Sequence, residues 1–170
     1  MGYKLLMLLL LIPLAFASSH EEFDYTNGVP EGVDVVITED GLINGNIDGT
    51  VTVESGEVTI KLDTTGEVTI TGDGKVVDIS GNVITSGTAR FEGGKLTHLD
   101  GQATINEFEI DGQDIKVDGD TLTASSVTIN GKEYSSLGDG ETTFELGDKG
   151  VIINGNFESD GIKYNGYVRM

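Results

Sequence analysis

Residues 68–83 read VTITGDGKVVDISGNV, and this stretch decides the fold class. Apolar and polar residues alternate in VTI at 68–70 and again in VDI at 77–79, which is the two-residue period of a strand with one buried face. The intervening TGDG and the later SGN are rich in the small residues that favour tight turns. The stretch therefore predicts short β-strands separated by sharp changes of direction.

The same alternation returns along most of the chain. It is present at 51–53, 58–62, 68–70, 77–79, 103–105, 108–110, 115–117, 127–129 and 144–146. All glycines except Gly2 lie between Gly28 and Gly166, and no ten-residue stretch after residue 17 has the 3.6-residue apolar period of a helix. Glycine opposes helix formation because each one costs about 1 kcal/mol relative to alanine. The sequence predicts an all-β protein.

A second pattern, an apolar residue followed by a small polar residue and glycine, recurs ten times. The glycines are Gly45, Gly49, Gly72, Gly81, Gly101, Gly112, Gly119, Gly131, Gly155 and Gly166. Asx-Gly pairs between alternating strands are typical of hairpins, and hence of a sandwich or barrel. Strands with only two inward apolar positions instead favour a coil of short strands that meet at corners. We expect a single-stranded β-solenoid or β-helix with Asx-Gly corners; the alternative is an antiparallel β-sandwich or barrel.

Residues 1–17, MGYKLLMLLLLIPLAFA, have the pattern of a secretory signal peptide. Lys4 precedes an apolar run that is short for a bilayer-spanning helix, and Ala15-Phe16-Ala17 fits a small-x-small cleavage site. Residues 18–32 are expected to form an exposed leader or N-terminal cap, and residues 33–170 the all-β repeat domain. The chain is predicted to be secreted to the extracellular space or the cell envelope, without membrane insertion after signal removal.

Composition excludes several classes of function. The formal net charge is -19, from 29 Asp and Glu against 10 Lys and Arg, so binding to nucleic acid is not expected. The sequence contains no cysteine, which excludes disulfides and cysteine nucleophiles. His20 and His98 have no partner histidine at a ligand spacing, and no nucleophile-elbow, P-loop or zincin motif occurs. We therefore predict that the protein is not an enzyme.

Two residue pairs are candidate sites. Asp118 and Asp120 flank Gly119 and offer the hard oxygen ligands that Ca²⁺ prefers, so low-affinity calcium binding is the one cofactor expectation. Tyr164 and Tyr167 lie in a C-terminal segment that is more aromatic and basic than the rest, and they are candidate ligand-binding residues.

These features predict a non-enzymatic structural or adhesive protein of a cell surface or envelope. Its expected partners are further copies of itself, envelope or matrix components, and polysaccharide. The alternative function is a carbohydrate-binding or carbohydrate-processing module that uses clustered carboxylates.

The pattern of short alternating runs and Asx-Gly pairs in residues 33–166 is similar to that of extracellular β-helix and β-solenoid repeat proteins of microbial surfaces. The segment 68–83 also resembles bactofilins, which are β-helical scaffold proteins. Bactofilins work inside the cell, so the predicted signal peptide departs from that family. The resemblance implies a coiled β fold and a structural role, and it transfers no site residues.

Overall fold

A computed structural model describes residues 21–25 and 34–170, and within them it contains fifteen strands and no helix. The strands are β1 (Glu21–Tyr25), β2 (Asp34–Ile37), β3 (Gly41–Val53), β4 (Glu57–Ile60), β5 (Thr65–Ile70), β6 (Lys75–Val77), β7 (Val83–Glu92), β8 (Lys95–Ile105), β9 (Phe108–Asp118), β10 (Thr121–Ala124), β11 (Ser126–Ile129), β12 (Lys132–Ser136), β13 (Thr142–Gly147), β14 (Gly150–Ser159) and β15 (Ile162–Arg169). The all-β prediction is confirmed. The predicted signal peptide and most of the predicted leader lie outside the described residues, although β1 falls within residues 18–32 and pairs with β3.

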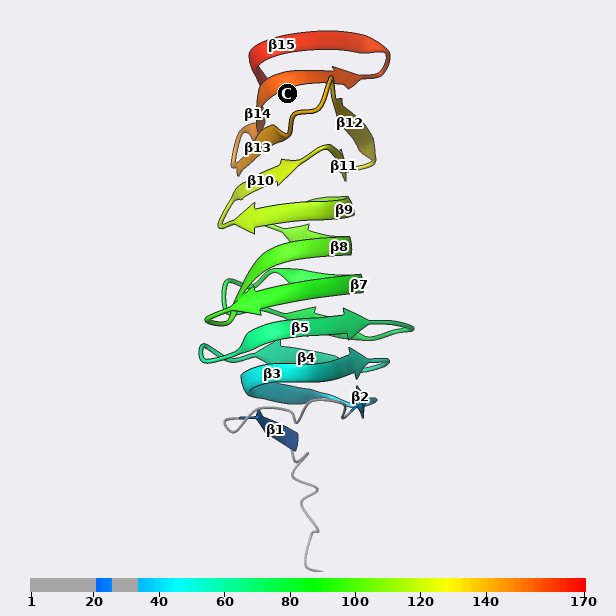
Figure 1. Ribbon diagram of the computed structural model, residues 1–170, viewed down its shortest axis with the longest axis vertical. Helices are drawn as coiled ribbons and strands as arrows, with labels where there is room; N and C mark the ends of the chain where they lie inside the picture. The colour runs from blue at the N-terminus through cyan, green and yellow to red at the C-terminus, as the bar shows by residue number, and fades with distance from the viewer. Residues whose placement is uncertain (1–20, 26–33) are drawn as a thin grey trace, which may run out of the picture.

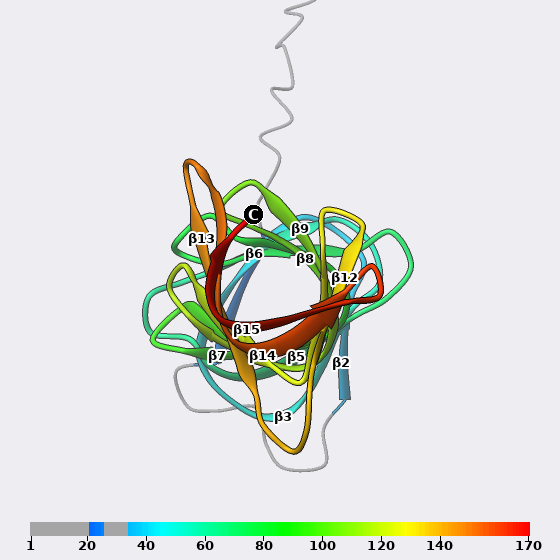
Figure 2. The ribbon, with the colours of Figure 1, turned by 90° about the horizontal axis from the view of Figure 1, so that it is seen from above.

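The strands are stacked along one long axis, with β1 and β2 at one end and β15 at the other (Figure 1). Seen along that axis, the strands curve around a common centre (Figure 2). The long strands cross two walls of the column. For example, the end of β9 pairs with β10, whereas its beginning pairs with β11.

We name the two walls by their pairings. The first wall runs from β2 through β3 (50–53), β5, β7 (87–91), β8 (96–99), β9 (115–118), β10, β13 and β14 (151–154) to β15 (167–169). The second wall runs from β1 through β3 (41–45), β4, β6, β7 (83–84), β8 (102–105), β9 (108–112), β11, β12 and β14 (156–158) to β15 (162–165).

One continuous hydrophobic core lies between the walls. It consists mainly of Val, Ile and Leu, from Ile37 near the N-terminal end to Phe157 near the C-terminal end. The C-terminal part of the core is aromatic. The ring of Tyr134 meets that of Phe144 edge-on, with 5.7 Å between the ring centroids, and the ring of Phe157 stacks on that of Tyr164 with 4.9 Å between centroids. Because Tyr134 is buried in this part of the core, the pKa of its phenol is raised, and the nearby charge of Lys132 opposes this shift.

The chain fits the alternative fold, an antiparallel barrel, better than the single-stranded β-solenoid that we expected. Strands β9, β10, β13, β14, β12 and β11 close a six-membered antiparallel ring, and the other strands lie outside it. A solenoid that winds in one sense pairs its coils in parallel, and this holds only for the pairings among β1 to β6. From β7 onward each pairing is antiparallel, because tight turns reverse the chain.

The Asx-Gly pairs occupy two different kinds of position. Gly119 and Gly131 lie in the turns that follow β9 and β11, as a hairpin protein requires. Gly101, Gly155 and Gly166 instead lie in the middle of β8, β14 and β15, between the parts of each strand that belong to different walls. Some Asx-Gly pairs therefore form corners within the long strands, and others form the hairpin turns that connect one strand to the next.

The β8–β9 hairpin has a two-residue loop in which a glutamate occupies an unfavourable backbone conformation. Ile105 pairs with Phe108, and the loop residues Asn106 and Glu107 have φ of 47° and 69°. This is the type I′ geometry, in which glycine is preferred at the second position because it has no Cβ.

We predict that Glu107→Gly raises the free energy of unfolding by about 1 kcal/mol, since the strain released exceeds the added entropy of the unfolded chain. Urea denaturation measures this gain in the free energy of unfolding, provided that the dependence of that free energy on urea concentration is the same for both proteins. Glu107→Ala is the control: it removes the same charge but keeps the Cβ, so it should give no gain. Equal stabilisation by both variants would show that the glutamate charge, and not the backbone, is responsible.

Candidate functional site

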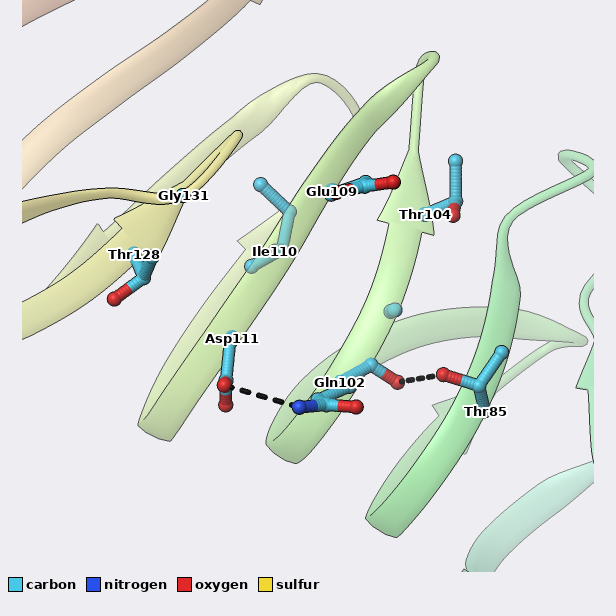
Figure 3. A pocket seen from close by; sticks show the side chains of 9 residues that line it. Thr85, Gln102, Thr104, Glu109, Ile110, Asp111, Thr128 and Gly131 are labelled. Atoms are coloured by element: carbon cyan, nitrogen blue, oxygen red, sulfur yellow. Dashed lines mark hydrogen bonds between the residues drawn. The ribbon is translucent and has the colours of Figure 1, made fainter.

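A polar depression of about 430 Å³ lies on the outer surface of the second wall (Figure 3). Four strands contribute most of its polar groups. Thr85 comes from β7, Gln102 and Thr104 from β8, Glu109 and Asp111 from β9, and Thr128 from β11. The two carboxylates occupy alternate positions of β9 and so project from the same side of the sheet.

The strand register places these side chains side by side. Gln102 lies opposite Asp111, and Asp111 lies opposite Thr128 on the other neighbouring strand. The Gln102 Nε2 donates to Asp111 Oδ2 at 3.1 Å, and the Thr85 hydroxyl donates to the Gln102 backbone carbonyl at 3.4 Å (Figure 3). The Asn130 side-chain oxygen accepts from the backbone N–H of Glu109 at 2.9 Å, which ties the β11–β12 turn to the edge of the depression.

This arrangement is suited to hydrogen bonding with a hydroxyl-rich or amide-rich ligand. The side chains of Gln102, Glu109 and Asp111 are all exposed, so their polar groups are accessible to solvent. No aromatic side chain lines the depression, whose lining also includes Ala103 and Ile110. Small-molecule sites are usually mostly apolar, whereas most of the residues that line this depression are polar.

Asp118 and Asp120, the calcium candidates, both lie exposed at the turn between β9 and β10. The backbone carbonyl of Asp120 accepts from the N–H of Leu146. Within residues 21–25 and 34–170, no group of three or more His, Cys, Asp or Glu side chains is placed to hold a metal ion. Calcium binding by this pair stays a prediction.

The structure does not bring the two tyrosine candidates together. Tyr164 is half-buried and stacks on Phe157, so its ring closes the C-terminal end of the core. Tyr167 is 69% exposed and lies on the first wall opposite Asn154. A shared ligand platform would need both rings on one surface, so only Tyr167 is available as an exposed aromatic contact. Ligand binding by either residue stays a prediction.

Two residues that pattern reasoning did not single out as sites have unusual polar environments. Asp78 is 3% exposed, and its carboxylate accepts four hydrogen bonds, so it is a fully paired structural group. His98 lies on β8 between Arg90 and Lys116 on the neighbouring strands, and its buried Nδ1 has no hydrogen-bond partner. Neither lines the depression of Figure 3.

The comparisons with known proteins do not assign this chain to a family: no family model, no curated protein and no solved structure matches it. In the part of the chain that the structure describes, there is no helix with the length and hydrophobicity needed to span a membrane.

Proposed function

We propose that this protein is a secreted, non-enzymatic structural or adhesive component of a cell surface, envelope or extracellular matrix. The observation that carries the proposal is the column itself: its long apolar side chains are concentrated in one continuous core, and its walls present polar and acidic groups. An elongated body with polar walls is suited to spacing, support or multivalent contact (Figure 1).

The groups that line the depression also favour a non-enzymatic role. Its two carboxylates are exposed, and one of them, Asp111, is already engaged by Gln102. No histidine, lysine or arginine lines this depression to stabilise a developing anion.

Cell fractionation and N-terminal sequencing test this proposal. We expect the protein in the medium or the envelope fraction, with Ser18 as its first residue, because cleavage after Ala17 completes export. The variant Ala15→Leu/Ala17→Leu should block processing and leave the chain uncleaved, because the cleavage site requires small residues. A cytosolic protein that retains Met1 would contradict the proposal.

A second candidate function, carbohydrate binding or processing, is favoured by the depression of Figure 3 alone. Gln102, Glu109 and Asp111 supply donors and acceptors on one face of two neighbouring strands, where the hydroxyl groups of a sugar chain could bond to them. If this function is correct, Asp111→Ala should weaken binding to a glycan array by about tenfold, which is the loss of one or two hydrogen bonds to a charged group. Glu145→Ala removes an exposed carboxylate from the first wall, away from the depression, and should have no effect. Hydrolysis of a bound glycan, lost in Glu109→Gln, would show processing.

A further inference from the structure

Within the described residues, the last strand leaves one row of its backbone groups without a strand partner. Among the described strands, β15 pairs only with β14. The N–H of Met170 donates to the carbonyl of Val151, and the N–H of Val151 donates to the carbonyl of Met170. The pairing between β14 and β15 has no bulge, so hydrogen-bonded and non-bonded pairs alternate along it. The N–H and C=O groups of Lys163, Asn165, Tyr167 and Arg169 therefore point away from β14, toward the end of the column.

This edge is basic in an acidic protein. The sequence of β15, IKYNGYVR, contains two positive charges and no acidic residue. Lys163 and Arg169 are exposed, and neither forms an ion pair with any residue in 21–25 or 34–170. Lys163 belongs to the second wall and Arg169 to the first wall, so each wall ends in one positive charge.

The opposite end has the complementary charge. Among the described strands, β1 and β2 each pair only with β3, so each also presents an outer edge. The sequence of β1, EEFDY, contains three acidic residues, and that of β2, DVVI, contains Asp34. Neither contains a basic residue. β1 ends the second wall and β2 ends the first, at the end of the column opposite β15 (Figure 1). Each wall therefore has a strand with acidic residues in its sequence at one end and a positively charged residue of β15 at the other.

Pairing of two β15 strands with each other is disfavoured. The bends of neighbouring long strands put glycine opposite glycine, as in Gly155 with Gly166. An antiparallel β15 pair centred on Gly166 would place Lys163 directly opposite Arg169, twice. Like charges at opposed positions destabilise a strand pair. The occupant that suits this edge is the acidic end of another column.

We propose that β15 of one copy of this chain pairs with the β1 and β2 edges of a second copy, head to tail. This inference goes beyond the proposed function, and it does not depend on secretion or on adhesion. A head-to-tail contact of this kind is heterologous and does not close by twofold symmetry, so it produces linear chains of molecules. Lysine at a strand edge also protects some proteins against such pairing, and that interpretation predicts a monomer.

Sedimentation equilibrium of the protein, isolated as its host produces it, tests the proposal at 0.15 M ionic strength. At that salt concentration charges interact over about 8 Å, so only charges close to the contact matter. We expect the average mass to rise steadily with concentration in the range about 10 μM to 1 mM, as for a small polar interface. A constant monomer mass would overturn the proposal.

Charge reversal locates the contact. Lys163→Glu/Arg169→Glu should lower the association constant by at least about tenfold, because two attractive contacts become repulsive. Lys75→Glu/Lys95→Glu makes the same change in net charge on the walls of the column and should leave association close to that of the unchanged protein. Equal effects of the two double variants would overturn the proposal. Thermal unfolding of each variant shows whether the fold is intact.

Crosslinking decides the orientation, because the chain has no cysteine of its own. Val36 on β2 and Tyr167 on β15 are 53% and 69% exposed and end the same wall. Oxidation of Val36→Cys/Tyr167→Cys should give a ladder of dimers, trimers and longer chains. Tyr167→Cys alone should give no covalent dimer on oxidation, because its cysteines do not meet in a head-to-tail chain. A covalent dimer from the single variant would show tail-to-tail pairing instead. A double variant that forms no crosslinked products, at concentrations where sedimentation shows an increased average mass, would also overturn the head-to-tail arrangement.

Discussion

Replacement of Gly101 by alanine is expected to reduce the free energy of unfolding by about 3–5 kcal/mol, which for a domain of this size lowers the melting temperature by roughly 10 °C. Gly101 lies at the bend of β8 with φ of 148° and opposite Gly87 on β7. A Cβ at this position would overlap the carbonyl oxygen of Ser86 and approach the Cα of Gly87 to 2.8 Å. Both neighbours are backbone atoms, so no side-chain rearrangement can relieve the overlap.

A graded series of glycine variants separates steric overlap from backbone strain. Gly119 has φ of 60°, and no atom lies within 4 Å of the position that a Cβ would take, so Gly119→Ala should cost about 1 kcal/mol from strain alone. Gly140 has neither feature, and Gly140→Ala should change stability by less than about 0.5 kcal/mol. Thermal and urea unfolding of the three variants measure how much stability each one loses, and the loss should fall from Gly101→Ala through Gly119→Ala to Gly140→Ala. If Gly101→Ala were as mild as Gly119→Ala, close packing at the strand bends would not be a main determinant of this fold.

Replacement of Asp78 by alanine is expected to cost at least about 3 kcal/mol, because several buried donors would lose their acceptor. Oδ1 accepts from the backbone N–H groups of Ser80 and Asn82, both at 2.9 Å. Oδ2 accepts from the Asn82 side-chain amide at 2.9 Å and from the backbone N–H of Leu96 at 3.0 Å. The carboxylate thus holds the 78–82 turn together and ties it to β8.

The variant Asp78→Asn tests whether both oxygens are needed. An amide has one acceptor oxygen, and its NH₂ group would face two of the four donors in either orientation. We therefore expect Asp78→Asn to be destabilising by about 2 kcal/mol, less than alanine but clearly measurable. Asp73→Asn is the matched control, because Asp73 is exposed in the turn before β6, and it should be close to neutral. If Asp78→Asn were also neutral, the carboxylate would not be the organising group of the turn.

The candidate depression could be predicted only in part. The acidic and amide residues that line it are visible in the sequence, and alternation along β9 places Glu109 and Asp111 on one side of a strand. Gln102 and Asp111 become neighbours only because the hairpin at 106–107 sets the register between β8 and β9. That hairpin lacks glycine, so its type I′ loop is not apparent from the usual turn residues.

The all-β class, the acidic surface and the lack of cysteine chemistry were determined by the sequence itself, because alternation, charge and composition are local or additive properties. The direction of strand pairing was decided only by the tertiary structure. An Asx-Gly pair supplies positive φ both to a turn, as at Gly131 with φ of 77°, and to the bend of a continuing strand, as at Gly155 with φ of 151°. Which of these forms depends on the neighbouring strand, and that neighbour can lie far away in sequence. The same reason explains why Tyr164 joined the core while Tyr167 stayed exposed, although the two are close together in the sequence.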